Sequence, residues 1–165
     1  MNKTLSSDAK KSLNTLMIVW VTMLSSLGVY MMVCYMIMTQ GNFKAPRTPA
    51  FLHTPFFMGI DAIIFVYGAA FLLLAFGIIH FKSSYAKLVG KMATQTFETA
   101  DDAFNAFRKA YANVMFIHMS IFNAISILGV IVFLVTLDFS TLINLMILAA
   151  AGYFLVMPNA KKFVL

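Results

Sequence analysis

Long uncharged stretches alternate with short charged ones along this chain. Four stretches contain no Asp, Glu, Lys or Arg: residues 12–43, 62–81, 112–137 and 139–160. A helix rises about 1.5 Å per residue, so about 20 apolar residues cross a hydrocarbon core roughly 30 Å thick. The pattern therefore predicts four membrane-spanning helices, near 14–38, 57–81, 113–137 and 141–159.

The stretches are apolar on both faces, as in the run from Leu16 to Val21. The strands of a membrane β-barrel would alternate apolar and polar residues instead. We therefore expect an all-α membrane fold in which residues 1–165 form a single four-helix transmembrane domain of two antiparallel hairpins. Lys10 and Lys11 precede the first stretch as in a secretory signal, but its apolar run is too long and no small-x-small cleavage site follows, so we expect it to be retained.

Composition agrees with a lipid environment, because 61% of the residues are hydrophobic and 11% are charged. The net charge of +6 is better explained by membrane orientation than by nucleic acid, since ten of the twelve basic residues lie on one side of the predicted helices. These ten are Lys3, Lys10, Lys11, Lys82, Lys87, Lys91, Arg108, Lys109, Lys161 and Lys162. The opposite side has only Lys44 and Arg47. Both termini are thus predicted to be cytoplasmic, in the inner cell membrane.

The cytoplasmic connection, 82–112, is predicted to be largely helical. Its aromatic residues recur at helical spacing: Phe97, Phe104, Phe107 and Tyr111. Thr99 and Asp102 have the spacing of a capping box, which predicts that a helix begins near Thr99 and runs into the third span. The aromatic stripe is expected to pack on the neighbouring extension, Tyr85 to Met92, or on a partner subunit, in preference to lipid.

The two outer connections differ. Residues 40–54 contain Gly41, Pro46 and Pro49, with Pro55 following, which predicts an irregular loop. The connection at 138–141 is so short that the third and fourth helices must form a tight hairpin, with Asp138 or Ser140 capping the fourth helix.

Asp61 is the acidic residue closest to a predicted span. A carboxylate inside a membrane is a functional-site hypothesis, because burying it is costly. By helical rise it lies about 6 Å below the outer interface, where water or snorkelling reaches it and the helix dipole favours it. It is interpreted as an interfacial or capping residue, with ion or proton binding as the alternative.

His118 and Asn123 lie on the third predicted helix, five residues apart and so not on one face. Asn123 lies near the depth of Ser25 and Ser26 on the first helix, which predicts an interhelical hydrogen bond. His80 and His118 both belong to the cytoplasmic half, as in axial ligation of haem, but helical rise separates their depths by roughly 8 Å. No cofactor is therefore predicted.

Other features favour packing over chemistry. Small residues repeat at seven-residue spacing on the second helix, Gly68 with Ala75 and Ala70 with Gly77, which suits close helix contacts within the chain or between copies. The single cysteine, Cys34, allows no intramolecular disulfide. The sequence has no phosphate-binding glycine loop, metal-ligand spacing, nucleophile motif or nucleic-acid module. We therefore expect a protein that is not an enzyme and has no metal site.

The run from Phe122 to Phe133, FNAISILGVIVF, resembles the ion-carrying helix of the proteolipid (c) subunits of rotary ATPases, as does the two-hairpin size. This resemblance implies a ring-forming membrane component. Asn123 stands where the family has its ion-binding carboxylate, and the glycine-rich first helix of the family is missing. Kinship would then imply a packed scaffold without proton transport.

Three hypotheses follow. The first is a non-enzymatic membrane subunit, in contact with lipid, that forms homo-oligomers or joins other subunits of a membrane complex. The second is an ion- or proton-conducting subunit that uses Asp61. The third is a subunit of a redox complex that holds haem or quinone.

Overall fold

The structure is a computed structural model and describes residues 7–159. It contains four helices: α1 (Ser7–Gln40), α2 (Ala62–Thr94), α3 (Ala100–Thr136) and α4 (Phe139–Leu155). The expected all-α fold with four helices is confirmed. Lys3, Lys161, Lys162 and the side chain of Lys10 lie outside the described residues.

Three of the helices, α1 to α3, are long and apolar enough to cross a membrane. The fourth predicted span is shorter than expected, because α4 ends at Leu155 and Pro158 follows, which cannot continue a helix. Its 17 residues extend over about 25 Å.

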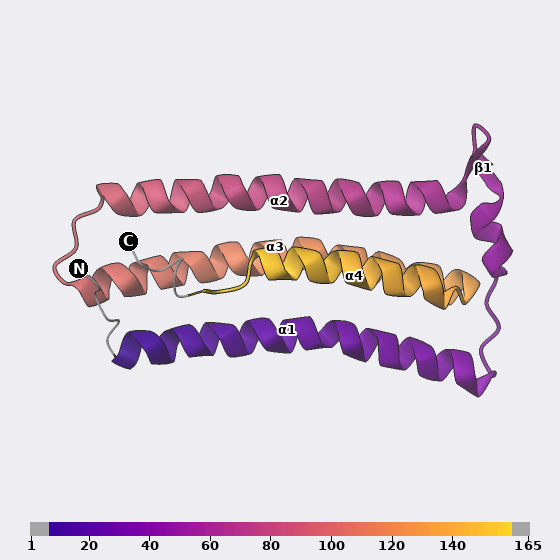
Figure 1. The fold of residues 1–165 in the computed structure, drawn as a ribbon, viewed down its shortest axis with the longest axis horizontal. Coiled ribbons are helices and arrows are strands. Elements are labelled where there is room, and N and C mark those ends of the chain that lie inside the picture. The colour runs from indigo at the N-terminus through magenta and orange to yellow at the C-terminus, as the bar shows by residue number, and fades with distance from the viewer. Residues whose placement is uncertain (1–6, 160–165) are drawn as a thin grey trace.

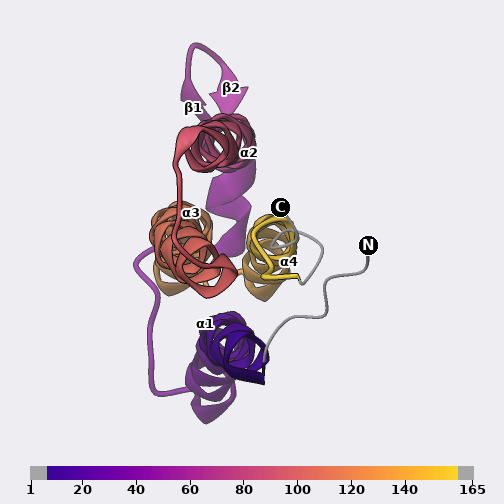
Figure 2. The same cartoon turned by 90° about the vertical axis from the view of Figure 1, so that its left-hand side faces the viewer.

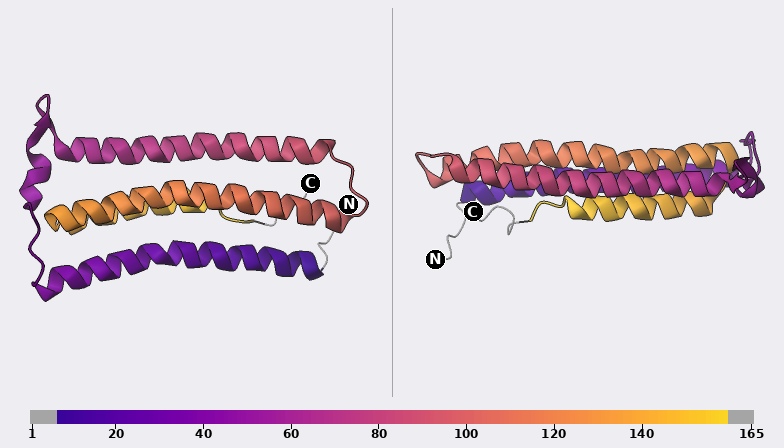
Figure 3. Two further views of the ribbon diagram at one scale, coloured as in Figure 1. Left: turned by 180° about the vertical axis from the view of Figure 1, so that it is seen from behind. Right: turned by 90° about the horizontal axis from the view of Figure 1, so that it is seen from above.

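The helices lie nearly parallel to one axis but do not form a square bundle. α3 and α4 form a central layer, and α1 and α2 flank it on opposite sides (Figures 1 and 2). The view from above in Figure 3 shows the same alignment of long axes. Of the two predicted hairpins, only that of α3 and α4 forms, and α2 and α3 also lie side by side, joined by the short connection 95–99. α1 and α2 do not pair, because the connection between them crosses the C-terminal end of α3, where the Arg47 backbone N–H donates a 3.0 Å hydrogen bond to the Val135 carbonyl.

This connection contains two short elements that place the start of α2. A 3-10 helix, η1 (Pro49–His53), is followed by a hairpin of β1 (Pro55–Phe57) and β2 (Ile60–Asp61). The two turn residues, Met58 and Gly59, have φ angles of 52° and 79°, as a type I′ turn requires. The predicted helix start at residue 57 is therefore wrong, and α2 begins at Ala62.

The closest helix contacts surround Phe122 on α3. Its side chain is fully buried between Gly77 on α2 and Gly152 on α4, and a Cβ atom at either glycine would lie 2.4 Å from the ring. Glycine is thus required at both positions for three helices to meet around one aromatic side chain. This contact also fixes the register of α2 against α3.

The two extensions on either side of the α2–α3 connection are helical as predicted, since α2 continues to Thr94 and α3 starts at Ala100. Thr99 caps α3, because its Oγ1 accepts a 3.1 Å hydrogen bond from the Asp102 backbone N–H. The Thr99 hydroxyl also donates to Asp102 Oδ2 at 2.6 Å. The predicted start of this helix near Thr99 is confirmed.

Both ends of α4 are anchored by side chains. Asp138 caps its start, where Oδ1 accepts the backbone N–H groups of Ser140 and Thr141. At its other end, the Trp20 indole and the Tyr111 hydroxyl donate to the carbonyls of Tyr153 and Val156. These bonds satisfy carbonyls that a helix terminus leaves without a helical partner.

Candidate functional site

Two histidines meet at the interface of α2 and α3. His80 Nδ1 and His118 Nε2 are 2.9 Å apart, a hydrogen-bond distance. The predicted depth difference of roughly 8 Å is wrong, because the Phe122 contact with Gly77 sets a register that places residue 80 opposite residue 118. We refer to His80 and His118 as the histidine pair.

The hydrogen bonds of the histidine pair determine its tautomers. His118 Nδ1 lies 2.6 Å from the Val114 carbonyl, which can only accept, so Nδ1 carries the proton. In the neutral ring, Nε2 is then an acceptor, and His80 Nδ1–H donates to it. The His80 Nε2 lone pair remains for another donor, and His80 is exposed whereas His118 is fully buried.

Aromatic rings surround the histidine pair. Phe76 stacks on His80 at a centroid distance of 5.5 Å, and the Phe81 ring meets the His118 ring edge to face at 5.2 Å. Tyr85 continues this row towards Phe107 and Tyr111 on the extension of α3. The pair therefore joins α2 to α3 inside an otherwise apolar interface.

The histidine pair does not fit the axial ligands of a haem. Two metal–nitrogen bonds of roughly 2 Å on opposite sides of one metal would separate the ligand nitrogens by about 4 Å, with the macrocycle between them. The observed separation is 2.9 Å, and both nitrogens of His118 already have partners. Within residues 7–159, no group of three or more His, Cys, Asp and Glu could hold a metal ion.

Asp61 lies before α2 and not inside it. It is the half-buried N-cap residue at the end of β2, and its side chain makes no capping hydrogen bond. The prediction that it lies a few residues inside the second helix is wrong, because the β1–β2 hairpin occupies the first predicted turn. The sequence of α2 itself contains no carboxylate.

Asn123 does not form the expected bond to the first helix. The hydroxyls of Ser25 and Ser26 donate to carbonyls of their own helix, at Val21 and Met23, as serines commonly do in apolar helices. The Asn123 Oδ1 atom is buried without a hydrogen-bond partner. In the described part of the chain, three other buried side-chain atoms share this state: Arg108 Nε, Ser126 Oγ and Tyr153 OH.

The predicted partner-contact residues lie mostly inside the chain. Phe104, Phe107 and Tyr111 are buried, and the last two pack on Tyr85 of α2 at 6.4 and 6.2 Å between ring centroids. Packing on the neighbouring extension, one of the two expected arrangements, is thus observed. Phe97 is half-buried at the edge of the same cluster. Among the four predicted contact residues, only Phe97 has a partly exposed side chain that a partner could contact.

A polar contact that the sequence did not predict joins α2 to α4. Asn144 Nδ2 of α4 donates a 2.9 Å hydrogen bond to the Tyr67 hydroxyl of α2. Both side chains line a hollow of about 400 Å³ beneath η1, together with His53 and Asp138. Asn144 lies within an uncharged stretch. An amide in such a stretch is itself a signal, because it needs a hydrogen-bond partner on a neighbouring helix.

Comparison of the chain with models of protein families, with curated proteins and with solved structures finds no match. The likeness of residues 122–133 to the proteolipids of rotary ATPases therefore stays a prediction.

Proposed function

We propose that this chain is a non-enzymatic structural subunit of the cell membrane that assembles side by side with copies of itself or with other membrane subunits. It crosses the bilayer four times, with both termini in the cytoplasm. The observation that carries this proposal is the flat arrangement in which α1 and α2 flank the α3–α4 layer with their outer apolar faces uncovered.

Membrane embedding is supported by the three long apolar helices and by the charges at their ends. The end of the molecule with the α2–α3 connection has Lys82, Lys87, Lys91, Arg108 and Lys109, whereas the opposite end has Lys44 and Arg47. Positive charges favour the cytoplasmic side, which orients the α2–α3 connection inwards. α4 lies beside α3 and antiparallel to it (Figure 3), and its 17 residues would return the chain across most of a hydrocarbon core.

Assembly is supported by the distribution of burial. The interior is formed mostly by α3 and α4, whereas large side chains on the outer faces of α1 and α2 are mostly uncovered, for example Met32 at 65% and Leu72 at 72% exposure. These faces differ in sequence and lie at opposite edges, so a contact between α1 of one copy and α2 of the next would be heterologous. A heterologous contact that closes on itself produces a ring.

Two exposed glycines offer positions for a test of this contact. Gly28 on α1 and Gly68 on α2 are both exposed, and a Cβ atom at either would meet nothing within 4 Å. The contacts of Trp20 with Phe154 and of Gly77 with Phe122 place the two glycines at nearly the same height. If α1 of one copy packs on α2 of the next, cysteines at these positions come within disulfide reach.

The experiment is oxidative cross-linking in native membranes of a Gly28→Cys/Gly68→Cys variant in a Cys34→Ala background. We expect a ladder of covalent oligomers from the double variant and none from either single variant. A Gly28→Cys/Gly90→Cys variant is the matched control, because Gly90 is equally open but lies on the cytoplasmic extension of α2. Absence of the ladder, together with a single copy of this chain in the native complex, would contradict homo-oligomeric assembly, and any co-purifying chains would then identify the other subunits. A native mass equal to that of one chain alone would overturn the assembly proposal.

A further inference from the structure

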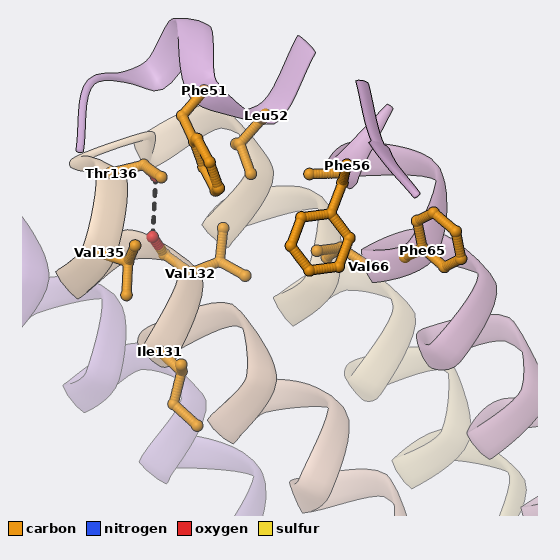
Figure 4. A pocket seen from close by; sticks show the side chains of 10 residues that line it. Phe51, Leu52, Phe56, Phe65, Val66, Ile131, Val132, Val135 and Thr136 are labelled. Atoms are coloured by element: carbon orange, nitrogen blue, oxygen red, sulfur yellow. Dashed lines mark hydrogen bonds between the residues drawn. The ribbon is translucent and has the colours of Figure 1, made fainter. Parts of the chain in front are cut away.

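An apolar pocket of about 230 Å³ lies at the outer end of the molecule, enclosed by η1, the β1–β2 hairpin, α2 and α3 (Figure 4). Its inner wall includes the buried side chains Leu52, Ala62 and Val132, whereas Phe56 and Ile131 at its rim are largely exposed. The volume accommodates roughly seven groups the size of a water molecule or a methylene. The lining exposes no polar surface inside the pocket.

Arg47 lies beside the pocket and is held there by two contacts. Its backbone N–H donates to the carbonyl of Val135, and its guanidinium lies over the ring of Phe51 at 5.3 Å from the centroid. Both contact residues line the pocket. An exposed positive charge is thus fixed directly next to an apolar chamber.

The charge of Arg47 has an aromatic partner, Phe51, but no anionic partner within the described residues. No carboxylate is paired with its guanidinium, and the carboxylate of the nearby Asp138 accepts bonds from Ser140 and Thr141 of its own cap. Arg47 is also one of only two basic residues on the side of the membrane that ordinarily has few. Neither membrane orientation nor an ion pair therefore explains the positive charge of Arg47.

We propose that this pocket binds an anionic phospholipid of the outer leaflet, with the part of an acyl chain nearest the headgroup in the apolar chamber and the phosphate on Arg47. Arginine recognises phosphate through charge-assisted, bidentate hydrogen bonds. The rim residues Phe56 and Ile131 open the chamber towards the apolar layer of the bilayer, so a chain enters from the lipid without crossing water. Lys44 lies in the same loop and adds to the local positive potential. This site rests on the membrane embedding in the proposed function but not on assembly.

The test is native mass spectrometry of the full chain in detergent, titrated with phosphatidylglycerol or with phosphatidylcholine of the same acyl chains. For the wild type we expect roughly tenfold preference for phosphatidylglycerol. Arg47→Gln should abolish this preference, whereas Lys44→Gln, the matched loss of one charge in the same loop, should retain most of it. If the two variants lose the preference for phosphatidylglycerol equally, the attraction is diffuse electrostatics, and the proposal of a binding site at Arg47 is overturned.

The apolar chamber is tested separately. Ala62→Leu fills the pocket and should weaken binding of both lipids, whereas Ala69→Leu, on the exposed face of α2, should leave binding unchanged. If Ala62→Leu does not fold by circular dichroism, Ile131→Trp at the exposed rim takes its place. Competition by inorganic phosphate at a concentration equal to that of the lipid, or a co-purifying quinone in place of phospholipid, would overturn the proposal. The same spectra report copy number, so failure of assembly is seen independently of lipid loss.

Discussion

The indole nitrogen of Trp20 donates a 2.8 Å hydrogen bond to the backbone carbonyl of Tyr153, 133 positions further along the chain. Trp20 is buried and its ring also meets Phe154 edge to face at 5.5 Å. This contact fastens α1 to the end of α4. The remaining contacts of α1 with the central layer come mainly from apolar side chains such as Leu16 and Leu27.

Trp20→Phe should destabilise the fold by about 0.6 to 1.5 kcal/mol, because it removes the indole donor and leaves the Tyr153 carbonyl with one partner fewer. The measurement is unfolding by SDS in mixed micelles, followed by circular dichroism. Met32→Leu, on the exposed face of the same helix, is the control and should change little. Equal stability of Trp20→Phe and the wild type would show that the bond contributes nothing.

Gly77→Ala and Gly152→Ala should each cost about 1 to 3 kcal/mol, because the new methyl group would overlap the Phe122 ring. Gly68→Ala, which meets nothing within 4 Å, should cause no loss. Phe122→Leu provides space, so the Gly77→Ala/Phe122→Leu double variant should lose less than the sum of the single changes. Additive losses in the same unfolding assay would argue against this contact.

Thr99→Ala should loosen the first turn of α3 by about 1 kcal/mol, because it removes the cap on the Asp102 backbone N–H. Hydrogen exchange of residues 100–103 should accelerate, with little change in the long apolar part of α3. Thr94→Ala is the control, since its hydroxyl bonds only to carbonyls of its own helix. Faster exchange along all of α3 would contradict a local cap.

The hydrogen bonds of the histidine pair predict which ring nitrogens carry protons, and NMR can measure this. In their neutral forms, both rings should carry the proton on Nδ1, as their hydrogen bonds require. Nitrogen-15 NMR of labelled histidine distinguishes the tautomers, and His53→Ala removes the signal of the third histidine. His80→Phe should change the His118 Nε2 signal and cost about 0.5 to 1.5 kcal/mol. In a neutral His118 ring, a proton on Nε2 would leave Nδ1 without one and would be incompatible with the hydrogen bond to the Val114 carbonyl.

Much of the architecture follows from the sequence, because membrane helices are encoded by long uncharged runs and by local capping signals. The four helices and the cap at Thr99 were predicted from such signals and are observed, and of the two residues expected to cap α4, Asp138 and Ser140, the structure has Asp138. The start of α2 was misplaced because Phe56 and Phe57 are as apolar as a membrane helix, and hydropathy does not distinguish a short β-hairpin from a helical turn.

The candidate site was predicted less well, because it depends on the register between helices. His80 and His118 were separated by counting from span ends, whereas their meeting is set by the fit of Phe122 against Gly77. The interhelical bond expected for Asn123 failed for a related reason, since Ser25 and Ser26 have carbonyls of their own helix within closer reach. Neither contact can be derived from periodicity along one helix.

The central place of α3 and α4 has a consequence for biosynthesis. A ribosome delivers α1 and α2 first, yet these two helices lie on opposite sides of a layer that has not yet been made. A nascent chain that ends at Thr94 therefore has two separated helices. The contact partners of Trp20 and Gly77, which are Tyr153 and Phe122, have not yet been synthesised. Tertiary structure in this protein begins with the second half of translation.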